Sequence, residues 1–305
     1  MKPLLNTETL ILPLPRLDES CFNDIVFHTD AALFDQTRVS IGFFQRYGGV
    51  SQPPFDSLNT SSNVGDLAIC VKRNRELVVS ALGGAEDTPL IVPKQVHGNV
   101  VVGTHRTHDI PNSQFQAQLG ADAVTVGCDD VCALLNFADC VPIIIVTPHA
   151  TFAVIHAGWR GVLNRIVEKA FDVLRARDSI DSSQCNVYIG PHIRSCCFEV
   201  SSDVADQFKQ EFGDEVLVDA HHVELSLALR LSLKNVGVDS QRICDINACT
   251  CCSQNYFSYR KSGGECGRHA AAAMRISETG DTTREFSKRD KRFWSNGPKK
   301  HSKET

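Results

Sequence analysis

Short apolar runs rich in β-branched residues follow one another through the middle of this chain. Their close spacing and nearly continuous apolar character predict strands of a sheet that is buried on both faces. A strand covered on one face only would instead alternate apolar with polar residues. The predicted strands are 121–126, 131–137, 142–147, 151–157, 186–190 and 242–246, with shorter strand-like pieces at 90–92, 256–259 and 268–276.

Helical periodicity alternates with these strands. Apolar residues between Gly161 and Arg177 recur at every third or fourth position, which predicts an amphipathic helix. Similar patterns predict a helix after Gly65-Asp66 and helices at about 200–212 and 223–236. Because helices and strands are mixed along the whole chain, the sequence predicts one α/β domain.

Composition limits the classes of protein to which the chain can belong. Of 305 residues, 42% are hydrophobic and 22% are charged, as in ordinary globular proteins. A net charge of −5 argues against a dedicated nucleic-acid binder, which usually carries a basic face. The absence of an 18-residue apolar run and of a secretory signal predicts a cytoplasmic protein without membrane spans.

Three parts of the chain are expected. An N-terminal extension at 1–38 joins the core, a catalytic domain spans 39–276, and a charged, disordered tail covers 277–305. Basic runs in the tail, Lys288–Arg292 and Pro298–Lys300, leave open a role as a contact for an acidic surface.

Cysteine is frequent, with thirteen residues. An odd number without a secretion signal favours buried free thiols in a reducing compartment over a disulfide framework. A second metal site is conceivable in the cysteine-rich segment at 249–266, but the second pair of a C-x2-C…C-x2-C pattern is missing. The adjacent Cys196-Cys197 is expected to serve packing or to face a pocket.

His97, Cys140 and His156 each end or begin a strand-like run. Two imidazoles and one thiolate can form a three-ligand zinc site whose fourth position is left for water or substrate. The long gaps between them match no compact zinc signature, and each residue could instead belong to the core. Their common place at strand ends, where α/β folds put ligands, favours a shared pocket.

The run Gly158-Trp159-Arg160-Gly161 connects a predicted strand to a predicted helix. Free backbone N–H groups at such a turn attract anions, and Arg160 adds charge-assisted donors, so a phosphate beside the metal is a hypothesis. A plain tight turn with Arg160 in a surface ion pair is the alternative. Arg46 and Arg194, in loops bounded by glycine or proline, are further anion candidates.

A set of short motifs between about Val39 and Ile276 resembles the YfiH-like family, long labelled as multicopper polyphenol oxidases or laccase-domain proteins. The motifs that carry the resemblance are Gly48–Ser51, Leu58-Asn59, Gly65-Asp66, Asn74-Arg75, Gln95–Gly98, Ala121–Ala123, Ala138–Pro142, His156–Gly161, Ile189–Pro191 with Cys196-Cys197, and Phe257–Arg260. One departure is the segment Lys261–Cys266, where the family tends to have Arg, Asp, Gly and Thr before a Gly-Arg pair.

The resemblance implies a fold of packed β-sheets flanked by helices, like that of the catalytic domain of cytotoxic necrotising factor. It implies that His97, Cys140 and His156 are zinc ligands and catalytic residues. It also implies a purine nucleoside phosphorylase that acts on adenosine, inosine, guanosine or methylthioadenosine and that has adenosine deaminase activity. Nucleosides and phosphate are then the partners, with no nucleic acid or membrane, and the protein is a monomer or homodimer. Residues expected to contact substrate or phosphate are Arg46, Ser51, Gln95, Arg160, Arg194, Tyr259 and Arg260.

Other activities remain as alternatives. A copper-dependent phenol oxidase would need many His-x-His pairs, and this chain has none. One copper ion could still be bound by two His and one Cys. A metal-free hydrolase with Cys140 as nucleophile and His156 as base uses the same residues. A binding module recruited through the basic tail is the non-enzymatic alternative.

Overall fold

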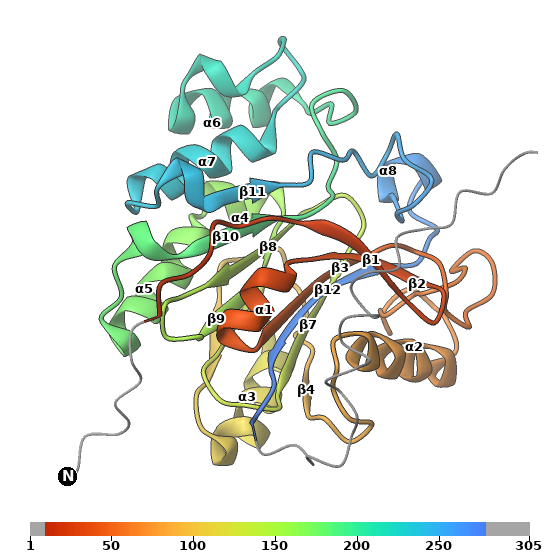
Figure 1. The fold of residues 1–305 in the computed structure, drawn as a ribbon. Helices are drawn as coiled ribbons and strands as arrows, with labels where there is room; N and C mark the ends of the chain where they lie inside the picture. The colour runs from red at the N-terminus through yellow and green to blue at the C-terminus, as the bar shows by residue number, and fades with distance from the viewer. Residues whose placement is uncertain (1–9, 279–305) are drawn as a thin grey trace, which may run out of the picture.

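The computed structural model describes residues 10–278, and over these residues the chain forms two six-stranded sheets (Figure 1). The first sheet has the order β1-β2-β3-β12-β7-β4, with β1 (Asp18–Phe22), β2 (Ile25–Thr29), β3 (Val39–Phe44), β4 (Leu90–Ile91), β7 (Cys132–Phe137) and β12 (His269–Arg275). The second has the order β11-β10-β8-β9-β6-β5, with β5 (Val101–Thr104), β6 (Ala123–Val126), β8 (Val141–Val146), β9 (Phe152–Ala157), β10 (Asn186–Ile189) and β11 (Ile243–Asp245).

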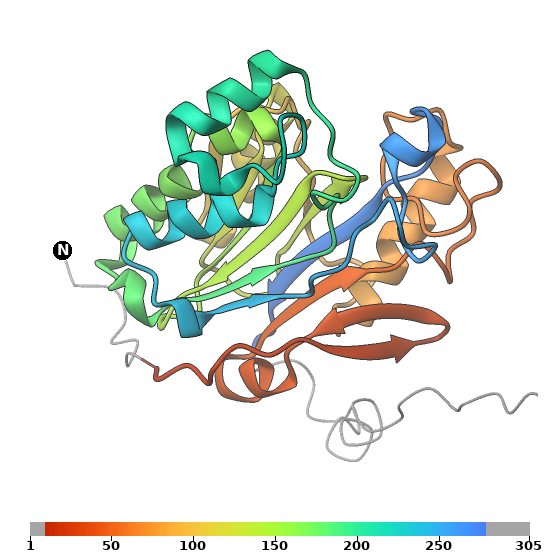
Figure 2. The ribbon, with the colours of Figure 1, turned by 90° about the horizontal axis from the view of Figure 1, so that it is seen from above.

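Helices cover the outer faces of the two sheets (Figure 2). The helices are α1 (Ala31–Thr37), α2 (Ala68–Ala81), α3 (Ile110–Leu119), α4 (Trp159–Leu163), α5 (Ile166–Asp178), α6 (Ser202–Phe212), α7 (Leu225–Asn235) and α8 (Tyr259–Ser262). Buried side chains of α1 and α3 belong to the cluster between the sheets, so these two helices do not cover an outer face. Side chains of α4 to α7 pack on the second sheet, and those of α2 pack on the first. The predicted architecture of packed sheets flanked by helices in one domain is confirmed.

The continuous apolar character of the central strands follows from this layering. In β8, Ile143 and Ile145 contact the helices, whereas Ile144 and Val146 lie between the two sheets. Successive strand residues point to opposite faces, so both faces must be apolar when both are covered.

Three expectations about local structure were wrong. β7 does not join β6, β8 and β9 in one sheet; it pairs with β12 and β4, and the chain crosses to the other sheet between β7 and β8. The helix expected from Gly161 to Arg177 is divided into α4 and α5 at Arg165, whose φ is 58°. The strand expected at 256–259 is absent, since Tyr259 opens the short helix α8.

The chain ends also bear on the expected organisation. β1 and β2 extend the first sheet by pairing with β3, so the described part of the N-terminal segment belongs to the main sheet. Ser277 donates its backbone N–H to Asp130, and the rest of the expected tail, from 279 onward, lies outside the described residues. No helix between residues 10 and 278 is long and apolar enough to cross a membrane.

Candidate metal centre and cavity

His97, Cys140 and His156 come together where the two sheets meet. Their ligand atoms all lie within 4.8 Å of one another, and the two imidazole rings stand edge to face with centroids 4.9 Å apart. His97 lies in the loop between β4 and β5, Cys140 in the crossing from β7 to β8, and His156 near the end of β9. Residues separated widely in sequence therefore form one donor group.

Asp122, which is fully buried, holds both histidines in place. One carboxylate oxygen accepts hydrogen bonds from His156 Nδ1 at 2.8 Å and from the backbone N–H of His97 at 3.0 Å. The other oxygen accepts from the N–H of Gly98 at 2.7 Å. These contacts stabilise the His97 turn, whose φ of 59° is uncommon for a residue with a side chain.

The same contact fixes which nitrogen of His156 faces the donor group. With Nδ1–H assigned as the donor to Asp122, Nε2 keeps its lone pair for a metal ion. Metal-ligating histidines usually donate their other ring N–H to such a carboxylate, which orients the ring and raises its basicity. The residues present therefore fit a zinc ion bound by two imidazoles and one thiolate.

Charge in the group is shared between Cys140 and His156. Burial raises the pKa of the Cys140 thiol, but the neighbouring His156 and His97 reverse this and bring it to about 6. Burial lowers the pKa of His156, yet Cys140 and Asp122 outweigh it and raise the value to about 9. Without a metal ion, these pKa values favour a thiolate beside an imidazolium near neutral pH, and the Nε2 proton of His156 has to leave before that nitrogen can bind a metal ion.

Gly158 permits the three ligands to meet. A Cβ atom at this position would lie 3.0 Å from His97 Cδ2 and 3.2 Å from Cys140 Sγ. Such distances are shorter than ordinary contacts, so the backbone at Gly158 packs directly on the donor group.

Asp139 supports the turn that presents Cys140. Its φ is 89°, and its carboxylate accepts hydrogen bonds from the Thr250 hydroxyl at 2.6 Å and from the backbone N–H of Arg260 at 2.7 Å. Its carbonyl accepts from the N–H of Ile193 at 3.0 Å. Three separate segments thus hold the Cys140 turn.

The donor group opens into a cavity of about 480 Å³. This volume lies in the range of pockets for small molecules, about 300–1,000 Å³. The cavity combines polar and aromatic side chains, and its lining is Ser61, Asn63, Val64, Pro93, Gln95, His97, Asn136, Ala138, Asp139, Cys140, His156, Trp159, Ile193, Phe198, Leu225, Tyr259, Arg260 and Arg268.

Of the seven residues expected to contact substrate, Gln95, Tyr259 and Arg260 line this cavity. The Gln95 amide is held by the backbone of Asn136, donating at 2.8 Å and accepting at 2.9 Å. Arg160 lies outside the lining, with its guanidinium 4.2 Å from the ring centroid of Trp159, which does line the cavity.

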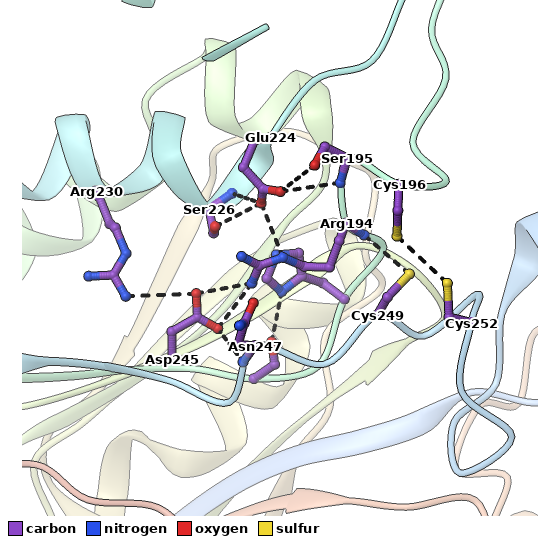
Figure 3. Close-up of polar contacts among 12 residues, drawn as sticks. Arg194, Ser195, Cys196, Glu224, Ser226, Arg230, Asp245, Asn247, Cys249 and Cys252 are labelled. Atoms are coloured by element: carbon purple, nitrogen blue, oxygen red, sulfur yellow. Dashed lines mark hydrogen bonds and ion pairs between the residues drawn. The ribbon is translucent and has the colours of Figure 1, made fainter. Parts of the chain in front are cut away.

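Arg194, Arg46 and Ser51 have other partners. Arg194 forms ion pairs with Asp245 at 3.0 Å and Glu224 at 3.2 Å (Figure 3). The Arg46 guanidinium pairs with Asp56 and covers the Phe257 ring, 4.5 Å from its centroid. The Ser51 hydroxyl donates to Asp66 at 2.6 Å.

Sequence reasoning assigned no role to Asp122, Asn136, Phe198 or Arg268, although Asp122 lies in one of the motifs that carry the family resemblance. Asp122 was visible as a carboxylate at the start of a buried strand, which is a signal for a second partner of a metal-bound histidine. Nothing in the local sequence distinguishes Asn136 or Phe198 from ordinary strand and loop residues, because only the fold brings them to the cavity.

Comparison with known proteins places these observations in a family. The family model described as "Multi-copper polyphenol oxidoreductase laccase" matches residues 40–276. "Purine nucleoside phosphorylase YlmD" of Geobacillus stearothermophilus is 32% identical over 251 residues, covering 78% of this chain and 90% of the relative. "Adenosine deaminase RL5" of an unknown prokaryotic organism is 31% identical over 246 residues, covering 77% and 90%.

Solved structures agree with the sequence relatives. The Bacillus licheniformis hypothetical protein YfiH superposes with a TM-score of 0.75 at 26% identity, covering 84% of this chain and 97% of that one. YlmD from Geobacillus stearothermophilus gives a TM-score of 0.72 at 30% identity, covering 78% and 92%. The chain therefore belongs to the multi-copper polyphenol oxidoreductase laccase family, which includes YfiH-like proteins.

Proposed function

We propose that this chain is a zinc-dependent purine nucleoside enzyme. It cleaves adenosine, inosine, guanosine or methylthioadenosine with phosphate to give free base and pentose 1-phosphate, and it deaminates adenosine. The names of two relatives support the reaction classes. The observation that carries the proposal is the His97, Cys140 and His156 donor group, which opens into a cavity large enough for a small ligand.

The protein's own residues prepare this site for chemistry. When bound, zinc supplies a Lewis acid and lowers the pKa of a bound water to about 7. Asp122 keeps the proton of His156 on Nδ1, so that Nε2 stays a ligand atom. The Cys140 thiolate contributes negative charge, which reduces the acidity of the metal compared with a site of three histidines.

Substrate recognition is proposed for the polar and aromatic walls. Tyr259 and Phe198 offer aromatic faces to a purine. Arg260 and Arg268 are the cationic residues in the lining and supply donors for phosphate, to which Arg160 can add from beside Trp159. Binding phosphate next to the ribose places an attacking oxygen at the anomeric carbon.

A panel of nucleosides, with and without phosphate, tests the proposal. Free base, pentose phosphate and ammonia are quantified separately for the native chain, Cys140→Ala and the matched control Cys70→Ala, which lies on helix α2 and does not line the cavity. Base and pentose phosphate should form only with phosphate, and ammonia from adenosine without it. Cys140→Ala should lose both activities by more than about 100-fold, since loss of a ligand exceeds the 10–100-fold cost of losing its supporting partner. Native protein that yields none of these products would overturn the proposal.

A second candidate, a metal-free thiol hydrolase, is favoured by one observation. The pKa of Cys140, raised by burial but brought to about 6 by the histidines, gives a nucleophile that is ionised at neutral pH. Exhaustive chelation separates the two candidates: hydrolysis that survives loss of all metal supports the thiol hydrolase.

The family description also names copper and phenol oxidation. A multicopper centre needs many histidines, whereas only two imidazoles join the donor group that is found among residues 10–278. Metal analysis of protein purified without added copper checks this point, and stoichiometric copper with phenol turnover would favour the oxidase.

A further inference from the structure

Four cysteines that do not line the cavity gather in a second group, and Figure 3 shows three of them, Cys196, Cys249 and Cys252. Cys196 and Cys197 lie in the loop that follows β10, and Cys249 and Cys252 lie in the loop that follows β11. Their sulfur atoms are all within 4.8 Å of one another. The segment 249–266 lacks the second pair of a C-x2-C…C-x2-C pattern, and the fold brings the adjacent residues Cys196 and Cys197 to it from another loop.

The spacing of the sulfurs suits one tetrahedral metal ion. Cys252 Sγ lies 3.6 Å from Cys196 Sγ and 3.4 Å from Cys197 Sγ. Zinc–sulfur bonds of about 2.3 Å separate the sulfurs of a regular tetrahedron by about 3.8 Å. A disulfide requires about 2.05 Å, and Cys252 has two nearly equidistant partners, so the geometry favours no single cross-link.

The loop backbone supports thiolate at one member of the group. The N–H of Arg194 points to Cys249 Sγ at 3.5 Å. Backbone donors of this kind stabilise a metal-bound sulfur after its proton has been lost.

We propose that Cys196, Cys197, Cys249 and Cys252 bind one Zn²⁺ ion in a closed, four-thiolate structural site. Four protein ligands leave no position for substrate, which is the mark of a structural zinc site. Sulfur donors without carboxylates select a soft ion over magnesium or calcium. A polynuclear iron–sulfur cluster spreads its cysteines over several irons, whereas these four sulfurs all lie within 4.8 Å of one another.

The proposed site joins loops that form the wall of the cavity. Thr250, between two of the ligands, donates to Asp139, which precedes Cys140. Arg260 donates to the carbonyls of Cys197 at 3.1 Å and Glu199 at 2.8 Å. A zinc ion here fixes the wall carrying Phe198 and Arg260, so its loss should weaken substrate binding more than turnover.

Metal content per chain tests the proposal without any measurement of activity. The native protein should hold two zinc ions, and Cys140→Ala and the double variant Cys196→Ser/Cys252→Ser should hold one each. The combination of all three substitutions should hold none. Cys244→Ser is the control: this residue lies on β11, before the loop that carries Cys249 and Cys252, and is outside the group, so the variant should retain both ions.

A spectroscopic measurement guards against variants that fail to fold. Cobalt added to chelated, reduced Cys140→Ala protein should give the intense absorption of a tetrahedral four-thiolate centre at one equivalent. Folding of each variant is checked by circular dichroism. An intact Cys196–Cys252 or Cys197–Cys252 disulfide after purification, stoichiometric iron, or zinc content unchanged in the folded double variant would each overturn the proposal. Failure of the nucleoside assays would not alter these outcomes.

Discussion

Two groups of side chains that could each hold a metal ion differ in the number of ligands and in their relation to the cavity. His97, Cys140 and His156 offer three ligands from the meeting edge of the sheets and line the cavity. Cys196, Cys197, Cys249 and Cys252 offer four thiols from two surface loops and line no part of it. The first arrangement leaves a coordination position for substrate, and the second closes it.

The supporting contacts differ in the same way. A buried carboxylate, Asp122, orients His156 and holds the backbone of His97. Backbone N–H groups, by contrast, point to Cys249 in the cysteine group. A charged partner raises the basicity of a ligand and selects its tautomer, whereas backbone donors only stabilise thiolate charge. Support by a carboxylate therefore distinguishes the group that we propose to act in catalysis from the cysteine group.

Among changes to the supporting contacts, the largest effect should come from Asp122→Asn. The amide NH₂ turned toward His156 would favour the tautomer with its proton on Nε2, which blocks the ligand atom. Metal affinity at the triad and nucleoside turnover should each fall about 10–100-fold. Zinc titration and steady-state kinetics measure both, while the cysteine group should keep its ion.

Asp30→Asn provides the matched control for that variant. Asp30 is also a buried carboxylate, 2% exposed, and accepts from Tyr188 at 2.8 Å away from the cavity. It should destabilise the fold without a selective loss of triad zinc. Equal zinc affinity of folded Asp122→Asn and native protein would show that the triad does not depend on its carboxylate partner, so the two groups would not differ in their support.

A smaller effect is expected from Gly158→Ala. The new methyl group would press on His97 and Cys140, and overpacking by one methyl costs about 1–3 kcal/mol. Triad zinc affinity should fall about tenfold or more, since about 1.4 kcal/mol corresponds to tenfold. Gly98→Ala is the control, because a Cβ there would meet its nearest neighbours at an ordinary 3.6 Å. Similar affinities for both variants would show that the close approach at Gly158 is not needed.

The two groups differ in how well each could be predicted from the sequence. The triad was predictable because each member ends a strand-like run and sits in a family motif. The cysteine group was not predictable, because its two loops lie close together only when β10 and β11 pair as parallel neighbours. Only the fold brings Cys196 and Cys197 to the second loop.

The layering of the sheets was harder to predict than their strands. Continuous apolar runs indicate that both faces are covered, but they do not say whether the cover is a helix or another sheet. β7 and β8 have similarly apolar sequences, which do not show that the two strands belong to different sheets. In the structure the chain crosses between the sheets at Asp139, whose φ is positive. The contributions of Asn136 and Phe198 to the cavity depend on that crossing and could not be predicted.

The smallest expected difference between the two groups is in the number of protons that each releases when it binds a metal ion. At the triad, burial lowers the pKa of His156, but Cys140 and Asp122 raise it overall to about 9, so the metal-free ring is protonated below that pH. Cys140, with a pKa of about 6, is ionised above pH about 6. Zinc binds the neutral ring and the thiolate, so this pair should release about one proton between pH about 7 and 8, and fewer above about 9. Affinity through this window should therefore rise with pH.

The cysteine group should release more protons over the same range. Burial and the contact with Cys252 raise the pKa of Cys196 to about 11, and burial also raises that of Cys197. Both thiols must lose their protons, so loading should release at least about two. Calorimetry in two buffers of different ionisation enthalpy, on Cys140→Ala and on Cys196→Ser/Cys252→Ser, isolates each group. Equal proton release would mean that the two groups do not differ in their metal-free charge, and the distinction between an ionised catalytic site and a protonated structural one would fail.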